Sequence, residues 1–277
     1  MSMGMNAYVT LLSSEQYLDG VIILNQSLRF VKSEYPLFCA LSENISVQVA
    51  NFLNGVGIRT VRLKQSLIVE SLQNTSTFRH WNYTFDKLLI WGLKEFDKIV
   101  FVDADMLVLR NIDSLFHVPA FSAVCAGKSF HGNEKWNELN SGLMVIEPNI
   151  DVEAELIRKL DEVLQDRGSL INGIGDQDII HRYMPKWPDY PELHLDEGYN
   201  VFADFLTYYI LRLHYSFKKD SPKPIYVVHF IGKLKPWMKT SFRNKLWLAS
   251  MFIRNPYYFI PYFRCKTLLK KAMSFKI

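Results

Sequence analysis

The sequence predicts an α/β protein with a mostly parallel central sheet and a basic helical appendage at the C-terminus. The chain has 277 residues, of which 49% are hydrophobic and 22% charged, the composition of an ordinary globular protein with room for a large core. Short apolar strands alternate with helix-like segments near the N-terminus, which is typical of βαβ units. Acidic residues are absent after Asp220. The three cysteines are too few and too widely spaced for a disulfide framework or a zinc cluster.

The first part of the chain predicts two consecutive βαβ units. The strands expected from continuous apolar runs are residues 6–12, 37–41 and 58–63. The helices expected between them are residues 15–30, capped by Ser13 and Ser14, and residues 45–53, stopped by Asn54 and Gly55. Such units are right-handed and place ligands at the carboxyl ends of the strands.

The rest of the chain continues the alternation after a mostly polar stretch, residues 66–77. The expected helices are residues 83–96, 151–165 with Asp151 as its cap, and 176–184. The expected strands are residues 99–102, 122–126, 142–147 and 225–230. Repeats and long linkers are absent from the sequence, so we expect one catalytic domain, residues 1–237, followed by a tail, residues 238–277.

Two aspartates, Asp103 and Asp105, follow directly on the apolar run 99–102. Two carboxylates this close repel each other unless a cation lies between them. If both belonged to a strand, their side chains would point to the same side. Oxygen ligands select hard cations such as magnesium, manganese or calcium. A divalent cation site is therefore predicted, with a solvated turn or a helix cap as the alternative.

The segment 229–237 offers groups that would complete such a site. His229 ends a strand and could ligate the cation through a ring nitrogen, while Gly232 lets backbone approach an anion closely. Lys235 is a point charge suited to phosphate. Together they favour a cation that is shared with a diphosphate; a hydrogen-bonded core histidine and a solvated turn are the alternatives.

In six motifs, the chain resembles the glycogenin-like family of retaining, nucleotide-sugar-dependent glycosyltransferases (family 8). The motifs occur in the family's order, at residues 7–20, 85–87, 103–105, 140–142, 175–178 and 229–237. The resemblance covers most of residues 6–237 and implies a single Rossmann-like nucleotide-sugar-binding domain of the type-A glycosyltransferase fold.

The resemblance also implies roles for particular residues. Asp103, Asp105 and His229 would bind the metal, and Tyr17 would stack on uracil. Manganese is favoured because the ligand set mixes a nitrogen with carboxylates, and magnesium is the alternative. Asp176, Gln177 and Lys87 are the expected catalytic residues. The residues expected to hold the UDP-sugar and the metal are Thr10, Leu11, Ser14, Tyr17, Lys87, Asp103, Ala104, Asp105, Asn140, Ser141, Gly142, His229, Gly232 and Lys235.

The reaction implied is transfer of a hexose, glucose or galactose, from a UDP-sugar to a glycan or glycolipid with retention of configuration. Retention proceeds either through a covalent intermediate, for which Asp176 is the conceivable nucleophile, or through a front-face displacement, which we favour. The alternatives are a self-glucosylating primer enzyme and an inactive sugar-nucleotide-binding protein. A haloacid-dehalogenase-like phosphatase also uses Asp-X-Asp, but its motif expects Thr or Val where this chain has Leu107.

The tail combines positive charge with aromatic side chains. Residues 221–277 contain 12 Lys and Arg and no Asp or Glu. This pattern favours an anionic membrane surface; a helix pair packed on the body with a solvated basic face is the alternative, and a nucleic-acid arm is disfavoured by the acidic body. The sequence shows neither a secretory signal nor a long apolar run, so we expect a cytoplasmic protein, peripheral at the inner face of the membrane. The sequence does not predict the oligomeric state.

Overall fold

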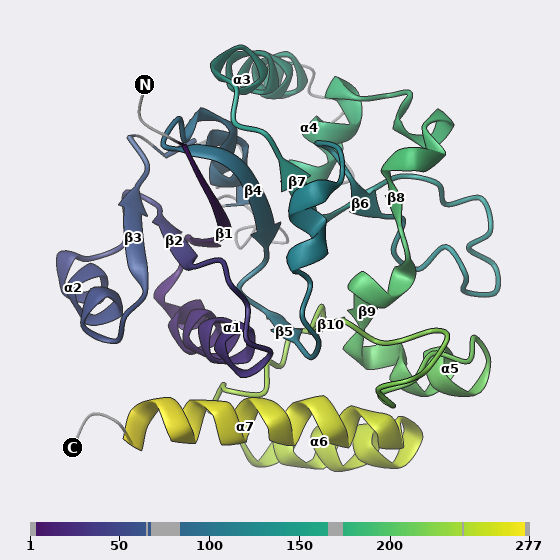
Figure 1. The fold of residues 1–277 in the computed structure, drawn as a ribbon. Helices are drawn as coiled ribbons and strands as arrows, with labels where there is room; N and C mark the ends of the chain where they lie inside the picture. The colour runs from purple at the N-terminus through teal and green to yellow at the C-terminus, as the bar shows by residue number, and fades with distance from the viewer. Residues whose placement is uncertain (1–3, 65, 68–83, 166–173, 240, 275–277) are drawn as a thin grey trace.

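The structure is a computed structural model that describes residues 4–64, 66–67, 84–165, 174–239 and 241–274. It contains a large sheet with helices packed around it, a small second sheet, and a pair of C-terminal helices along one side (Figure 1). None of the described helices combines the length and the apolar character needed to cross a membrane.

The large sheet is mixed but mostly parallel, as predicted. Its order is β3 (Arg59–Arg62), β2 (Leu37–Leu41), β1 (Met5–Leu12), β4 (Phe96–Val102), β7 (Asn140–Ile146), β6 (Ala123–Val124) and β8 (His194–Leu195). The first four strands are parallel, β7 runs antiparallel to both β4 and β6, and β6 is parallel to β8. The carboxyl end of β4 therefore lies beside the start of β7, and the predicted metal motif lies at that edge.

A second sheet of three short strands was not predicted. Its order is β5 (Met106–Val108), β10 (Val227–His229) and β9 (Val201–Phe202). β10 pairs antiparallel with β5 and parallel with β9. The strand predicted at residues 225–230 contains β10, but β5 and β9 have only three and two residues and leave little periodic signal in the sequence. This sheet brings the end of β10 next to the end of β4.

The helices mostly occur where the apolar spacing predicts them. The α-helices are α1 (Leu18–Phe30), α2 (Val47–Gly55), α3 (Ile150–Gln165), α4 (Asp176–Tyr183), α5 (Leu206–Leu211), α6 (Phe242–Arg254) and α7 (Phe259–Ser274). The 3₁₀ segments are η1 (Glu15–Tyr17), η4 (Thr84–Gly92), η5 (Asp113–His117), η6 (Trp187–Asp189), η7 (Pro191–Leu193), η8 (Glu197–Tyr199), η9 (Ala203–Phe205) and η10 (Pro256–Tyr258). Most predicted boundaries are correct to within about two residues, the usual uncertainty of such assignments.

Two predicted helix caps, Ser14 and Asp151, are wrong. Ser14 precedes η1 and makes no capping hydrogen bond, so α1 begins only at Leu18. At α3, the side chain of Asn149 accepts a hydrogen bond from the Asp151 amide at 2.8 Å, so Asn149 performs the role predicted for Asp151.

The helix predicted over residues 83–96 is the largest error. The structure has η4 at Thr84–Gly92, and Phe96 already begins β4, while Tyr83 lies outside the described residues. All residues from Phe85 to Trp91 are buried. A segment that is buried on every side has no solvent face to impose a helical period, so its winding follows its tertiary partners.

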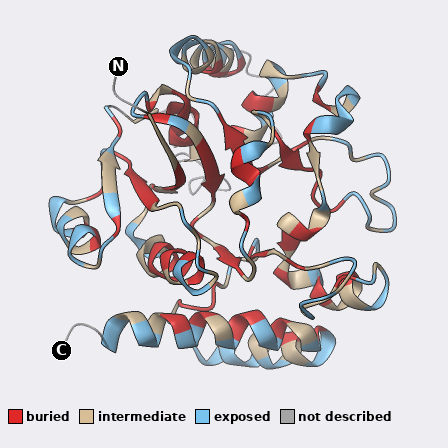
Figure 2. Ribbon diagram, viewed as in Figure 1, coloured by how far each residue is buried: buried red, intermediate tan, exposed pale blue. Residues whose placement is uncertain are grey.

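The C-terminal helices pack on the body of the protein. Figure 2 shows buried positions along α7, on the side turned toward the rest of the chain, whereas Met251 is the one buried residue of α6. Tyr258, Tyr262, Cys265 and Leu268 are buried in one apolar cluster with Ile23 of α1 and other body residues. The tail is therefore helical, as predicted, and packed as one of its alternatives expects. The domain boundary at residue 237 stays a prediction.

Candidate active site

Asp103 and Asp105 directly follow β4, as predicted, and lie in a turn between β4 and β5, so strand alternation does not apply to them. The Met106 amide donates to the Asp103 carbonyl at 3.1 Å, and the Asp103 amide donates to the Gly142 carbonyl at 2.8 Å. The Phe230 amide donates to the Asp105 carbonyl at 3.0 Å. The turn is thus held by both sheets. Both carboxylates face one site, but because of this turn and not because of strand alternation.

Asp105 is held between two groups, one from the end of β10 and one from the segment that follows it. Its Oδ1 lies 3.2 Å from Nε2 of His229, and its Oδ2 lies 2.7 Å from Nζ of Lys235. Lys235 also donates to the Phe230 carbonyl. Burial by itself would raise the pKa of Asp105, but His229 and Lys235 outweigh it and hold that pKa below its usual range. Asp105 is therefore a permanently charged ligand candidate.

Asp103 belongs to a second charged group centred on Lys87. Nζ of Lys87 lies 3.0 Å from Oδ1 of Asp103 and 2.9 Å from Oδ2 of Asp176. Burial lowers the pKa of Lys87, yet the two carboxylates raise it above its usual value, so the ammonium stays charged. Burial raises the pKa of the Asp103 carboxyl to about 6, with Lys87 opposing that shift. Lys87 thus links the Asp-X-Asp turn to the start of α4.

Strand β7 and helix α4 meet at the predicted sugar-binding residues. The hydroxyl of Ser141 donates to Oδ2 of Asp176 at 2.7 Å, and the Ser141 amide donates to Oε1 of Gln177 at 3.1 Å. Lys87 also contacts the Ser141 carbonyl and hydroxyl at 3.3 and 3.2 Å. Asp178, three residues into the motif, accepts from the Gly175 amide at 2.8 Å, so its role is to cap α4.

A chain of hydrogen bonds fixes the proton on His229. The Gly142 amide can only donate, and it donates to Oδ1 of Asn140 at 3.1 Å. The Asn200 group that contacts the same Oδ1 at 2.7 Å must then be its Nδ2, so Oδ1 of Asn200 faces Nδ1 of His229 at 3.0 Å. Nδ1 of His229 therefore carries the proton. The Nε2 lone pair of a neutral His229 points toward Asp105.

Asp103, Asp105 and His229 fit a divalent cation. One ligand atom from each lies within 4.8 Å of the others. Nε2 of a neutral His229 and Oδ1 of Asp105 are both hydrogen-bond acceptors, and they lie 3.2 Å apart. Two acceptors at this distance repel each other unless a cation lies between them or the imidazole ring takes a second proton. Carboxylates combined with an imidazole suit a divalent transition metal. The donor set thus matches the predicted metal ligands.

Two glycines allow the elements to meet at this site. A Cβ on Gly142 would lie 2.7 Å from Cε1 of His229, and a Cβ on Gly20 would lie 2.3 Å from the Ala104 carbonyl oxygen. Neither backbone oxygen nor buried imidazole could yield that space. Gly142 therefore lets β7 approach His229, and Gly20 lets α1 approach the turn at Ala104. A Cβ on Gly232 would meet the side-chain carboxylate of Asp204, with the nearest oxygen at 2.7 Å.

The residues predicted to bind the nucleoside are only partly gathered at the site. Tyr17 lies near it, because Nζ of Lys235 is 5.7 Å from its ring centroid and the indole of Trp237 packs edge-on against it. Leu11 and Ser14 are partly exposed at the end of β1 and just beyond it. Thr10 is completely buried and its hydroxyl has no hydrogen-bond partner among the described residues.

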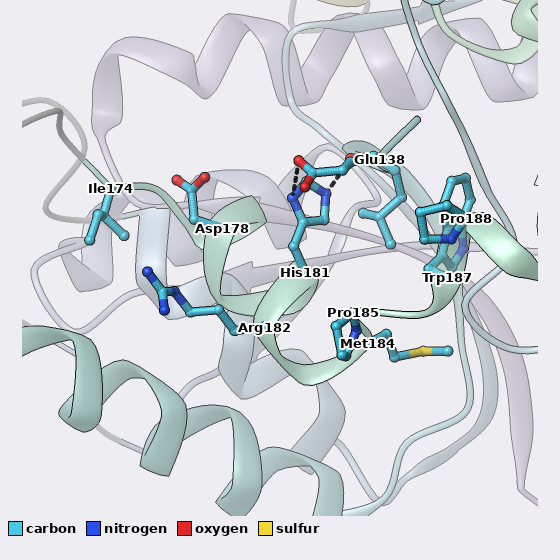
Figure 3. A pocket seen from close by; sticks show the side chains of 10 residues that line it. Glu138, Ile174, Asp178, His181, Arg182, Met184, Pro185, Trp187 and Pro188 are labelled. Atoms are coloured by element: carbon cyan, nitrogen blue, oxygen red, sulfur yellow. Dashed lines mark hydrogen bonds and ion pairs between the residues drawn. The ribbon is translucent and has the colours of Figure 1, made fainter. Parts of the chain in front are cut away.

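A pocket of about 430 Å³ on the outer side of α4 does not contain the metal-ligand candidates. Figure 3 shows His181 in its wall, beside the Glu138 carboxylate. Nδ1 of His181 lies 2.8 Å from Glu138 and Nε2 lies 2.8 Å from the Leu139 carbonyl. Because both ring nitrogens face protein oxygens, His181 offers no free nitrogen to a metal. Among the described residues, the Asp-Asp-His cluster stays the candidate metal site.

Sequence reasoning missed Asn200, Gly20 and Asp204. Asn200 orients His229, yet it stands alone beside a two-residue strand and carries no spacing signal. Gly20 lies within a motif that was recognised, but its role depends on a turn more than eighty residues away. Burial raises the pKa of Asp204, which lies near both Lys235 and His229. Only the folded chain brings these residues to the site.

Comparison with known proteins gives a consistent result. The family model described as "Glycosyl transferase family 8" matches residues 8–241. The chain is 32% identical over 235 residues to UDP-glucuronate:xylan alpha-glucuronosyltransferase 2 of Arabidopsis thaliana, covering 84% of this chain and 35% of that protein. It is 32% identical over 236 residues to glycogenin-1 of Caenorhabditis elegans, covering 83% of this chain and 50% of that protein.

A solved structure of the galactosyltransferase LgtC, in complex with donor and acceptor sugar analogs, superposes with a TM-score of 0.57 at 17% identity. The match covers 90% of this chain and 94% of that one. At this identity the likeness concerns the fold alone, and it agrees with the predicted type-A glycosyltransferase fold. The chain spans only a third to a half of the length of the two relatives named above.

Proposed function

We propose, from the premise that this chain belongs to glycosyl transferase family 8, that it transfers a hexose from a UDP-sugar to a glycan or glycolipid acceptor with retention of configuration. Glucose and galactose are the donors we favour. Two relatives are named as a glycogenin and a galactosyltransferase, which supports hexose transfer as a class. The observation that carries the proposal is the convergence of Asp103, Asp105 and His229 from three separate parts of the sequence.

A divalent cation, Mn²⁺ in preference to Mg²⁺, would be held by Asp103, Asp105 and His229. When bound, it would supply Lewis-acid stabilisation of the negative charge that develops on the nucleoside diphosphate. Lys235 adds a positive charge on the same side of Asp105, where it would assist the leaving diphosphate. Tyr17, close to Lys235, would contact the uracil ring.

The sugar would lie between β7 and α4. Asn140 and Gln177 carry amide groups that can orient its hydroxyls, and both are fixed by backbone contacts in β7. Asp176 would favour positive charge at the anomeric carbon. Its Oδ2 is engaged by Lys87 and by the Ser141 hydroxyl, and both bonds reduce its strength as a nucleophile. This supports front-face displacement, in which the departing phosphate accepts the proton of the acceptor hydroxyl.

The test is hydrolysis and transfer from a panel of UDP-sugars with and without Mn²⁺, by the full chain and by Asp105→Asn. We expect Mn²⁺-stimulated release of UDP from UDP-glucose or UDP-galactose. The Asn variant loses the charged ligand, so its activity should fall to background. Mn²⁺-independent activity, or undiminished activity of the variant, would contradict the proposed site.

The same panel separates the alternatives. A catalytically inactive binder would bind UDP with Mn²⁺ but release nothing from any donor. A self-glucosylating enzyme, which the similarity to glycogenin-1 keeps in consideration, would add hexose units to its own mass during incubation with UDP-glucose. Intact-protein mass spectrometry detects that change directly.

A further inference from the structure

Exposed apolar side chains are concentrated on the two C-terminal helices. The described chain has 14 large hydrophobic side chains that are exposed, and seven of them lie on α6 and α7. These seven are Phe242, Leu246, Ile253, Phe259, Ile260, Phe263 and Met273. Single exposed apolar residues are ordinary, but a concentration of them marks an interaction surface.

On α6 these side chains form one row. Phe242, Leu246, Ala249 and Ile253 follow each other at intervals of four, three and four residues, so they share one side of the helix. Phe242, Leu246 and Ile253 are 77%, 59% and 82% exposed. The opposite side of α6 carries Met251, which is buried against the body. We call this row the α6 stripe. It faces away from the body, so it does not contribute to the packing of α6 on the rest of the chain.

Basic residues border the α6 stripe. Arg243 and Arg254 lie on one flank and Lys245 lies on the other, and all three are exposed. Acidic side chains are absent from the sequence after Asp220, so nothing on α6 or α7 neutralises these charges internally. The surface is both apolar along its middle and positive along its borders.

Helix α7 extends the same combination. Phe259, Phe263, Lys266 and Lys270 again recur at intervals of four, three and four residues, and all are exposed. The ring centroids of Phe259 and Phe263 lie 4.3 Å apart. The ring centroid of Phe252 on α6 lies 5.6 Å from that of Phe259 and 6.1 Å from that of Phe263. The two helices run side by side along one side of the molecule (Figure 1). Their apolar residues thus meet at the corner between them.

We infer that α6 and α7 form a peripheral attachment surface for an anionic lipid bilayer, with the α6 stripe entering the interface and the basic borders facing the headgroups. An anionic bilayer, such as the cytoplasmic face of a cell membrane, satisfies both properties of the surface. A second copy of the chain would bring like charges together. Nucleic acid would use the charges but leave the apolar stripe unexplained. The inference does not depend on the transferase activity.

The test is co-sedimentation of the full chain with vesicles of phosphatidylcholine alone and with an equal mixture of phosphatidylcholine and phosphatidylglycerol. Deleting the tail is unsuitable, because Tyr258, Cys265 and Leu268 are buried and their loss would open the core. The stripe variant is Leu246→Ser with Ile253→Ser, which alters only exposed positions. The matched control is Val47→Ser with Leu211→Ser on α2 and α5, since these aliphatic residues are 65% and 57% exposed.

We expect the unmodified chain and the control to bind the mixed vesicles, and the stripe variant to bind them about tenfold or more weakly. Arg243→Gln with Lys245→Gln should weaken binding by about fivefold for each charge removed, the equivalent of about 1 kcal/mol. Raising the salt concentration should also weaken the binding to the mixed vesicles.

Three results would overturn the inference. The first is that the unmodified chain does not bind the mixed vesicles, and the second is that the stripe variant binds them as well as the control. The third is that sedimentation velocity shows the unmodified chain to be a dimer and the stripe variant a monomer, while neither binds vesicles. The α6 stripe would then be a contact between two copies of the chain. The UDP-sugar assay is run on the same preparations, so loss of attachment and loss of activity are measured separately.

Discussion

Asn200→Leu is the most informative single change at the candidate metal site. Asn200 is completely buried and makes two hydrogen bonds, to Asn140 at 2.7 Å and to Nδ1 of His229 at 3.0 Å. Leucine has the same branching but neither donates nor accepts. The change leaves the imidazole without the partner that fixes its proton on Nδ1, so Nε2 is no longer reserved for the metal.

The expected magnitude follows from the two bonds lost. Removing a hydrogen-bond partner of a metal-ligating histidine lowers metal affinity by about 10- to 100-fold, which is about 1.4 to 2.7 kcal/mol. Leaving one buried N–H unpaired should also lower the free energy of unfolding by about 1 to 3 kcal/mol. Both effects are measurable without knowledge of the acceptor.

The assay is calorimetric titration of Mn²⁺ in the presence of UDP, with thermal unfolding recorded on the same samples. Asn200→Asp is the comparison variant, because its carboxylate still accepts from Nδ1 of His229 but can no longer donate to Oδ1 of Asn140, so it should restore part of the metal affinity. If the Leu variant bound Mn²⁺ as tightly as the unmodified chain, the assignment of His229 as an oriented ligand would be refuted. Equal losses in both variants would point to a general packing defect instead.

Two further changes test other parts of the structure. Burial raises the pKa of the Asp103 carboxyl to about 6, so protons should compete with the metal for this carboxylate below that pH. Titrations at successive pH values should then show the Mn²⁺ affinity falling by up to about tenfold per pH unit. A Mn²⁺ affinity that is constant down to about pH 5 would argue against Asp103 as a ligand. Asp113→Ala removes the acceptor of the buried Tyr8 hydroxyl, 2.7 Å away, and should lower the free energy of unfolding by about 1 to 3 kcal/mol in urea titrations. Burial raises the pKa of Asp113, but hydrogen bonds from the Glu34 amide and from the side chains of Tyr8, Ser33 and Asn111 outweigh it and hold that pKa below its usual range. The stabilisation by Asp113 should therefore be present above about pH 4 and be lost as the pH falls further. If the stability of the Ala variant had the same acid dependence as that of the unmodified chain, this reasoning would be contradicted.

The sequence by itself determined the elements whose signal is local. The strand at residues 37–41 and the end of the first strand at Leu12 coincide with the prediction, because a continuous apolar run bounded by polar residues specifies a buried strand without help from distant partners. The same holds for the amphipathic stretch that forms α3. Asp103, Asp105 and His229 were also found from residue type and position relative to such runs.

The tertiary structure decided everything that depends on contacts between distant segments. The segment 84–92 is wound as a 3₁₀ helix because it is enclosed on all sides, and the strands of the second sheet exist only through pairing across the chain. Asn200 acquires its role only when β7 and β10 come together. On α6, both sides of the helix are apolar in sequence, and only the packing of Met251 inward shows that Leu246 and Ile253 face outward. The reason in each case is that a periodic pattern records which residues avoid water or share a face, but not which partner they meet.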